Sequence, residues 1–290
     1  MKIAFLGTGL MGTGFVRRFL ANGHSVNVWN RSADKARALE AHGAKAFADA
    51  AAAVEGVERI HVSLGDDASV DAVLEPLAGR IGAATWIIDH TTTAMHPTVE
   101  RAARWAARGV TYVHAPVFMG PANCAEGTGL MLTDGPKARH EALLPHLQPM
   151  TGTVLHLGEP VGRAAAFKLF GNLAIIGING VLGDVARLAE ALGVAPADAF
   201  TLFTHFNPGG NLAARAVRIE KGPHSPASFE TTMARKDVRL MIEEAQHGGV
   251  ALALMPAVAA LLDAAIARGE GALDIGAAMR SPGMKAVIAG

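Results

Sequence analysis

Short apolar runs alternate with stretches of helical periodicity through the first half of the chain. The strand-like runs, rich in Ile, Val, Phe and Trp, are residues 2–6, 25–29, 59–64, 86–89 and 110–113. Apolar positions recur at helical spacing between them, at residues 15–20, 33–41, 70–77 and 98–107. This alternation predicts βαβ units and therefore an α/β fold with a doubly wound, mostly parallel sheet.

From about Gly162 onward the strand-like runs disappear. The remaining periodic stretches are helical, at residues 163–192, 194–203, 229–246 and 250–268. Short breaks that carry glycine and proline separate them. We therefore expect an α/β domain over residues 1–162 and an all-α domain over residues 163–290.

The first strand runs directly into a glycine turn, GTGLMG, which opens a helix. In a dinucleotide-binding turn Gly7 permits the bend, Gly9 lets the backbone approach a pyrophosphate, and Gly12 lets the helix pack on the strand. The N-terminus of the helix, with Leu10 and Met11, can then hold the phosphates. A glycine-rich loop could match this spacing by chance, but the flanking strand and helix favour a dinucleotide site.

The second strand ends at Asn30, Arg31 and Ser32, where the adenosine ribose of a bound dinucleotide would lie. Sites for NAD generally place an acidic residue here, which accepts from the ribose 2′-OH. An amide, a guanidinium and a hydroxyl can instead donate to a 2′-phosphate, so the sequence predicts NADP(H) as the cofactor. A solvated arginine at the start of a helix is the alternative.

Further cofactor contacts are expected where the later strands end. Leu64 and Gly65 follow one strand, and three threonines, Thr91 to Thr93, follow the next. A backbone group or a hydroxyl there could meet the nicotinamide half of the cofactor. Three consecutive threonines are also an ordinary helix-capping sequence, which is the alternative.

The composition is that of a globular chain: 290 residues, 50% hydrophobic and 18% charged, with a formal net charge of zero. No basic block or acidic tail attracts nucleic acid or an anionic membrane surface. The single cysteine, Cys124, excludes an intrachain disulfide and suits a reducing compartment. We expect no leader and no apolar segment that reaches membrane-span length without interruption, hence a cytoplasmic protein. Twelve histidines occur without HExxH or paired-cysteine spacing, so we expect no metal site.

Lys168 and Asn172 lie four residues apart on a helix face otherwise built from Ala, Phe, Leu and Ile. A partly desolvated lysine has its pKa drawn toward neutrality, as a general acid or base requires, and an asparagine can hold a substrate oxygen. The alternative is a lysine that extends its ammonium to solvent beside a satisfied amide.

Taken in order, these motifs resemble those of the β-hydroxyacid dehydrogenases, a family that includes 3-hydroxyisobutyrate dehydrogenase and tartronate semialdehyde reductase. The resemblance extends over nearly the whole chain with matching spacing. The motifs that carry it are the glycine turn, Asn30 to Ser32, Ala115 to Val117, Glu126 to Thr128, Gly162, Lys168, Asn172, Lys236, Asp237 and Asp274.

The resemblance implies a Rossmann domain, of the kind found in 6-phosphogluconate dehydrogenase, joined by the long helix to the helical domain. It also implies an active site in the cleft between them. In such an enzyme Lys168 would be the proton donor and acceptor, and Asn172 would help to bind substrate. Thr92 and Lys236 would contact the cofactor. The family further implies a homodimer or homotetramer, with contacts made by the helical domains.

The chain departs from the family pattern around the substrate. Where the family reads Asp-Ala-Pro-Val-Ser-Gly-Gly, this chain reads HAPVFMG, so Phe118 and Met119 replace the serine and first glycine that seat a substrate carboxylate. Gly171 stands where the family often has an asparagine. We therefore expect Phe118, Met119 and Gly120 to contact a larger or less charged substrate than the short hydroxyacids.

The sequence as a whole predicts an NADP-dependent oxidoreductase that moves hydride between nicotinamide and a carbonyl or alcohol carbon, with Lys168 supplying the matching proton. Two alternatives stay open. The phrase VWNRS at the second strand resembles imine reductases, which share the fold but generally replace the lysine. The other alternative is an NADPH-binding sensor without turnover, and the retention of Lys168 and Asn172 argues against it.

Overall fold

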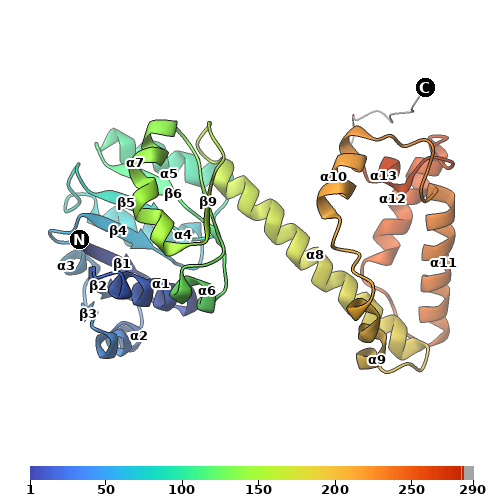
Figure 1. The fold of residues 1–290 in the computed structure, drawn as a ribbon, viewed down its shortest axis with the longest axis horizontal. Coiled ribbons are helices and arrows are strands. Elements are labelled where there is room, and N and C mark those ends of the chain that lie inside the picture. Colours follow the sequence, from blue (N-terminus) through green and yellow to red (C-terminus); the bar gives the residue numbers. More distant parts are fainter. Residues whose placement is uncertain (282, 284–290) are drawn as a thin grey trace. The chain divides into compact units, whose positions relative to one another are not determined.

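The computed structural model describes residues 1–281 and 283, and it divides into two compact units, Met1–Leu173 and Ala174–Gly290. The first unit is built on a six-stranded parallel sheet with the order β3-β2-β1-β4-β5-β6, drawn in blue to green in Figure 1. The strand order reverses between β1 and β4, where open α/β sheets bind ligands at the carboxyl ends of the strands. The strands are β1 (Lys2–Leu6), β2 (Ser25–Trp29), β3 (Lys45–Ala46), β4 (Arg59–Val62), β5 (Trp86–Asp89) and β6 (Thr111–His114).

Each face of the sheet has its own apolar core. Ile3 and Phe5 of β1 pack in one core, and Leu6, on the opposite face, packs in the other with Trp105. Because both faces are buried, β1 is apolar at every position after its first, which explains the continuous run in the sequence. The helices of this part are α1 (Leu10–Ala21), α2 (Ala33–Arg37), α3 (Ala50–Ala53), α4 (Asp67–Leu74) and α5 (Met95–Ala107).

The predicted doubly wound, mostly parallel sheet is confirmed, and two predicted α-helices end earlier than expected. The helix predicted over residues 33–41 is α-helical only to Arg37 and continues as a 3₁₀ helix, Ala38–His42. The helix predicted over residues 70–77 also ends in a 3₁₀ turn, Glu75–Leu77. In this second case Pro76 lacks the N–H that would continue the α-helical hydrogen bonds.

A second, three-stranded sheet follows, which the sequence does not predict. Its strands are β7 (Val117–Phe118), β8 (Leu130–Thr133) and β9 (Thr153–His156), with β8 antiparallel to β7 and parallel to β9. Helices α6 (Pro121–Glu126) and α7 (Lys137–Leu147) connect them. Runs of two to four residues are too short to show a strand period, and this sheet is what places Phe118.

Helix α8 (Arg163–Ala191) agrees with the helix predicted over residues 163–192. Gly162 precedes it with a φ of 102°, and the carboxylate of Asp134 accepts the N–H groups of Gly162 and Ala164 at 2.8 Å each. That carboxylate satisfies donors that a helix start leaves unpaired. The division between the two compact units falls inside α8, after Leu173, whereas the predicted domain boundary lies at its start.

The composition of α8 bears on one expectation. Among the described residues it is the one helix that could cross a membrane on length and composition alone: it has 29 residues, and its most apolar window has a mean hydropathy of 1.6 and is 11% buried. The core helix of a soluble protein can pass the same test, so the expectation that no uninterrupted apolar segment reaches membrane-span length stays a prediction. Polar residues such as Lys168 and Asn172 interrupt it but are too few to make it polar.

The second unit is helical, as predicted. A small core holds α11 against α12 through Ala234, Val238 and Leu262. Asp184 of α8 accepts the N–H of Leu254 at 2.8 Å, which ties the start of α12 to α8. The sequence does not predict α10, which lies between two glycine- and proline-containing breaks. The helices, labelled in Figure 1, are α9 (Pro196–Phe200), α10 (Leu212–Lys221), α11 (Thr231–His247), α12 (Met255–Ala267) and α13 (Ile275–Ala278).

Candidate active site

The glycine turn between β1 and α1 depends on close backbone approach. A Cβ on Gly7, which has a φ of 99°, would overlap the carbonyl oxygen of Ser63. A Cβ on Gly12 would overlap the carbonyl oxygen of Gly7, whereas one on Gly9 would meet nothing within 4 Å. Gly7 and Gly12 are thus required by the turn itself, and Gly9 leaves the backbone open to an approaching ligand.

A cavity of about 690 Å³ opens beside this turn, at the carboxyl ends of β1, β2 and β4. Gly12 packs beneath the turn rather than lining the cavity, and Thr92 and Lys236 do not line it. The predicted cofactor residues that do line it are Gly7, Gly9, Leu10, Met11, Asn30, Arg31, Ser32, Leu64 and Gly65. The structure therefore gathers most of that predicted set around one space.

Asn30 has a structural part in this cavity that its sequence position does not indicate. Its Oδ1 accepts the N–H of Thr8 at 3.0 Å, and its amide nitrogen donates to the carbonyl of Ser32 at 3.1 Å. Asn30 therefore ties the glycine turn to the loop that carries Arg31 and Ser32. Most of the hydrogen-bonding capacity of its side chain is therefore used within the protein.

The ribose end of the cavity is cationic. Arg31 and Lys35 line it, neither forms an ion pair within the described chain, and no acidic side chain is among its lining residues. The sequence prediction omits Lys35, although its position four residues after Arg31 at a helix start is a usable signal. Two unpaired cations and the hydroxyl of Ser32 suit a phosphate group.

A second cavity of about 210 Å³ adjoins the first, since Met11, Ser63 and Leu64 line both. Its other lining residues are Phe15, His90, Thr91, Thr92, Val117, Met119 and Lys168. The fold thus unites Thr92, Met119 and Lys168, which the sequence assigns to cofactor, substrate and proton. Phe118, Gly120 and Asn172 are outside this lining.

Lys168 lies on the first turns of α8 and is 9% exposed. Its Nζ lies 4.1 Å from the centroid of the Phe118 ring, and it has no hydrogen bond or ion pair within the described chain. Burial lowers the pKa of Lys168 below the usual lysine value. Asn172, one turn further on, is half-buried, and its amide likewise has no partner among the described residues.

The segment that departs from the family pattern offers few donors. Phe118 is apolar, and the N–H of Gly120 already donates to Oδ1 of Asn123 at 2.9 Å. Met119 lies beside the second cavity, where its sulfur is 3.8 Å from Sγ of Cys124. The substrate roles of Phe118, Met119 and Gly120 stay predictions, and the N–H of Gly120 is not free for a carboxylate.

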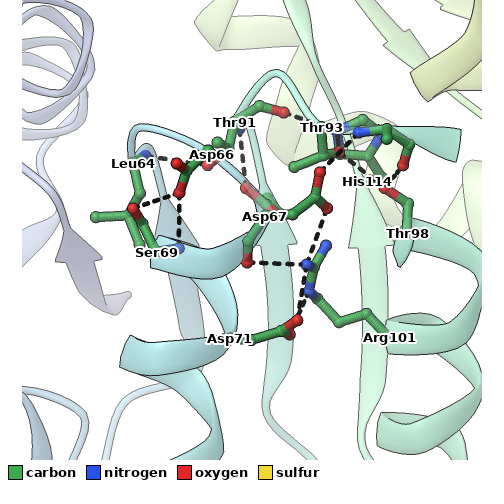
Figure 2. A network of polar contacts seen from close by, with 12 residues as sticks. Leu64, Asp66, Asp67, Ser69, Asp71, Thr91, Thr93, Thr98, Arg101 and His114 are labelled. Carbon is green, nitrogen blue, oxygen red and sulfur yellow. Dashed lines mark hydrogen bonds and ion pairs between the residues drawn. The ribbon is translucent and has the colours of Figure 1, made fainter. Parts of the chain in front are cut away.

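Figure 2 shows the polar network around the loops that follow β4 and β5. Thr91 donates its N–H to Asp89 at 2.8 Å, and its hydroxyl accepts the N–H of Leu64 at 3.0 Å. Nε2 of His114 donates to the carbonyl of Thr91 at 2.8 Å. These bonds fix Thr91 and join the loop after β4, which lines both cavities, to the loop after β5, which lines the second.

The same hydrogen-bond network bears on whether the threonines cap helix α5 or face the second cavity. The buried guanidinium of Arg101 pairs with Asp67 at 3.0 Å, and Asp67 accepts the N–H of Ala94 at 2.8 Å (Figure 2). Ala94 is the N-cap of α5, so no threonine caps this helix, contrary to the alternative interpretation. Thr92 is exposed, lines the second cavity and makes no hydrogen bond within the described chain, which leaves its hydroxyl for a ligand.

His90 borders the second cavity, with His61 buried behind it. Nδ1 of His61 lies 3.0 Å from Nε2 of His90, and Nδ1 of His90 lies 2.7 Å from the carbonyl oxygen of Ala115. Since a carbonyl only accepts, Nδ1 of His90 carries a hydrogen, and its Nε2 accepts from His61. Burial lowers the pKa of both side chains, that of His90 to about 4, so the pair is neutral at pH 7. The sequence prediction omits His61, and the feature that could have indicated it is a histidine within a buried strand.

Lys236 lies on α11 in the second unit, where its Nζ is 2.9 Å from the carboxylate of Asp237. Its predicted contact with cofactor stays a prediction, as does an active site between the two domains. Among the described residues, no group of three or more His, Cys, Asp or Glu side chains is placed to hold a metal ion.

The glycine turn, the two adjoining cavities and Lys168 are features of a nucleotide-dependent enzyme. Sequence comparison agrees with this class. Residues 2–158 match the NAD binding domain of 6-phosphogluconate dehydrogenase, and the chain belongs to that family. It is an NAD(P)-dependent oxidoreductase, and the resemblance to the β-hydroxyacid dehydrogenases is confirmed.

Similar proteins span nearly the full length. The chain is 28% identical to 3-sulfolactaldehyde reductase of Escherichia coli, over 99% of this chain and 98% of that protein. An imine reductase from Myxococcus stipitatus in complex with NADP⁺ matches with a TM-score of 0.90 at 18% identity, covering 96% of this chain and 98% of that one. A reductive aminase from Aspergillus terreus, in complex with NADPH and ethyl levulinate, matches with a TM-score of 0.84 at 25% identity and the same coverage.

The buried histidine pair predicts acid sensitivity. Each histidine has a lower pKa folded than unfolded, so below about pH 6.5 the unfolded chain binds more protons, and stability falls as the pH drops toward 4. Each histidine contributes a slope of about 1.4 kcal/mol per pH unit in that range. Urea unfolding from pH 7 to pH 5 measures it. His90→Gln should reduce the slope by about one proton, and His42→Gln, at an exposed histidine, should not. An unchanged slope in His90→Gln would contradict the assignment.

Proposed function

We propose that this chain is an NADP(H)-dependent dehydrogenase or reductase that transfers hydride between nicotinamide and a carbonyl or alcohol carbon. In this proposal Lys168 is the acid and base. The observation that carries it is the junction of two cavities, one lined by the dinucleotide turn and the other by Thr92 and the unpaired ammonium of Lys168.

The residues present fit NADP(H) rather than NAD(H). The open backbone at Gly9 and the start of α1 suit the pyrophosphate, whereas Arg31, Ser32 and Lys35 suit a 2′-phosphate. The absence of an acidic side chain from this lining removes the usual acceptor for an unmodified ribose 2′-OH. When bound, the nicotinamide supplies or accepts the hydride.

Lys168 supplies the matching proton. In the reducing direction its ammonium donates to the carbonyl oxygen, and in the oxidising direction its neutral amine accepts the hydroxyl proton. Burial lowers its pKa, so the neutral form is reached at a lower pH than in a solvated lysine. Asn172, on the same helix face, has a free amide that suits a substrate oxygen.

The substrate that suits this site is larger or less charged than a short hydroxyacid. Phe118 offers no hydrogen bond, and the N–H of Gly120 is taken by Asn123. Lys168 is the one cationic side chain, with His90 neutral, among the residues that line the second cavity. A substrate carboxylate would therefore compete with the carbonyl oxygen for a single ammonium.

Imine reduction is the second candidate. The imine reductase and reductive aminase named above favour it, as do the apolar side chains of Phe118 and Met119. Lys168 counts against it, because an ammonium repels the positive charge of an iminium. A sensor without turnover is less well supported, since a buried ammonium without a partner has a free energy cost that catalysis would explain.

We also propose a homodimer or homotetramer. Large apolar side chains of α8 are exposed, including Phe170, Leu173 and Ile176 at 62%, 75% and 70%. Exposed apolar surface of this kind usually meets a partner, and a second copy offers the same apolar face. The cytoplasmic location stays a prediction.

Sedimentation equilibrium of the full chain at micromolar concentration should give a mass of at least two chains. Flotation with phosphatidylcholine vesicles is the companion measurement, because α8 could also meet lipid. A monomer in the first experiment, or flotation in the second, would contradict the proposal.

The cofactor assignment predicts that NADPH binds more tightly than NADH. Arg31→Ala should reduce the ratio of the two affinities about tenfold or more, because a hydrogen bond to a charged group is worth about 1.5–3 kcal/mol. Calorimetric titration of both cofactors measures this ratio. Arg37→Ala is the matched control, since Arg37 pairs with Asp34 on α2 and does not line the cavity. Equal affinities in the wild type would reject the assignment.

The proton assignment predicts that Lys168→Ala loses turnover by roughly 10²- to 10⁴-fold, the contribution of a positioned acid or base. Cofactor binding should change little. In the wild type, reduction should slow and oxidation accelerate as the pH rises through the pKa of Lys168. Lys137→Ala, at an exposed lysine on α7, is the control. Wild-type turnover by Lys168→Ala would make the lysine structural and reject the proton assignment.

The substrate assignment predicts low kcat/KM on 3-hydroxyisobutyrate-like acids and semialdehydes. Phe118→Ser with Met119→Gly should raise it about tenfold, equivalent to about 1.4 kcal/mol of transition-state binding. A panel of these acids, neutral aldehydes and cyclic imines, assayed by NADPH absorbance, measures the effect. Efficient wild-type turnover of the short acids would show that other donors hold the carboxylate.

A further inference from the structure

Phe118 and Gly171, which both depart from the family pattern, meet in the structure. A Cβ on Gly171 would overlap Cζ of Phe118 and lie 2.5 Å from its Cε1. The ring therefore rests on bare backbone of α8, and any side chain at position 171 would displace it. Phe118 in turn belongs to β7, where it pairs with Leu130, so its backbone is fixed by the second sheet.

The Phe118 ring also holds Lys168, which lies nearly one helical turn before Gly171. Nζ of Lys168 is 4.1 Å from the ring centroid, and within residues 1–281 this is the sole electrostatic contact of a side chain that is 9% exposed. A cation over the face of an aromatic ring is attracted by the ring quadrupole, more strongly where water is excluded.

No other charged group of the described chain competes for that ammonium. His90, which lines the same cavity, is neutral because burial lowers its pKa to about 4. Arg163, on the same helix, stacks its guanidinium 5.5 Å from the centroid of the Phe167 ring. No carboxylate pairs with Lys168 among the described residues, so the ring face is its one stabilising partner.

We propose that Phe118 is a positioning residue for Lys168, and that Gly171 is the complementary residue that admits the ring. A ring face attracts the ammonium without accepting the strong hydrogen bond that a carboxylate would accept, so its N–H donors stay available to a substrate oxygen. A carboxylate in the same place would accept one or more of them. The role of Lys168 rests on the proposed function, whereas the contact between the three residues can be tested without turnover.

Under this proposal, the residues at positions 118 and 171 determine substrate specificity together. The ring occupies the space in front of Gly171 that a side chain at position 171 would need. Removing the ring alone would leave that space empty, and adding a side chain at position 171 alone would displace the ring. A polar side chain at position 171 therefore requires that the ring at position 118 be removed as well.

Graded fluorination tests the ring contact. Phe118 is replaced by mono-, di- and trifluorinated phenylalanine, which weakens the quadrupole while nearly preserving ring volume. The pKa of Lys168 is then read from the pH dependence of its acetylation by acetic anhydride, followed by mass spectrometry of its peptide. We expect this pKa to fall stepwise, by about 0.5 to 1 unit across the series. The exposed Lys137 is the internal control, whose labelling profile should not move.

A flat series, with the pKa of Lys168 independent of fluorination, would overturn the positioning role. The result is separable from the proposed function, because labelling requires no substrate. If Lys168→Ala abolishes turnover while the series is flat, only the positioning role fails. If the pKa of Lys168 falls with fluorination while Lys168→Ala keeps turnover, the contact between Lys168 and Phe118 is supported and the proposed function fails.

A double-mutant cycle tests the complementarity of Gly171. Gly171→Ala should lower the thermal unfolding midpoint by about 2 to 6 °C in the wild type, because the new Cβ overlaps the ring. In Phe118→Ser it should cause no loss, since the ring is gone and alanine favours helix. Gly177→Ala, on the same helix with nothing within 4 Å of the new Cβ, should be tolerated in both backgrounds. Equal effects of Gly171→Ala with and without Phe118 would overturn the coupling.

Discussion

Close backbone contact at the glycine turn is the constraint on which the rest of the site depends. A Cβ on Gly12 would overlap the carbonyl oxygen of Gly7, and one on Gly7 would overlap that of Ser63, so β1, α1 and the end of β4 meet with no side chain between them. This contact sets the start of α1 beside the loops after β2 and β4. It leaves a cavity at the sheet edge whose wall at Gly7 and Gly9 is bare backbone.

The second cavity contains one unusual electrostatic arrangement. An ammonium that is nearly buried normally has a carboxylate partner, but in the part of the chain that the structure describes Lys168 has only the face of Phe118. A carboxylate would stabilise the charge and also occupy the proton donors. The polar network around Thr91 and the neutral pair of His61 and His90 hold the surrounding loops in place. Neither places a competing charge next to Lys168.

The sequence predicts those features that a local pattern encodes. β2 and β5 are predicted residue for residue, because both lie between turn signals, β5 as a short apolar run and β2 as an alternation with Val26 and Val28 buried. The glycine turn and Lys168 are found for the same reason, since spacing within one segment carries them. β7 is too short to show a period, and the contact of Phe118 with Gly171 joins segments far apart in the chain. No local pattern encodes such a contact, and it had to come from the fold.

Isotope transfer tests the central claim most directly. The full chain is incubated with NADPH that carries deuterium at the transferable position of the nicotinamide, together with neutral aldehydes and ketones, and the alcohols are examined by mass spectrometry. The account predicts alcohols with one deuterium on the former carbonyl carbon, and none there when the label is in the water instead. Unlabelled alcohol from labelled NADPH, or no alcohol from any of these compounds, would contradict it.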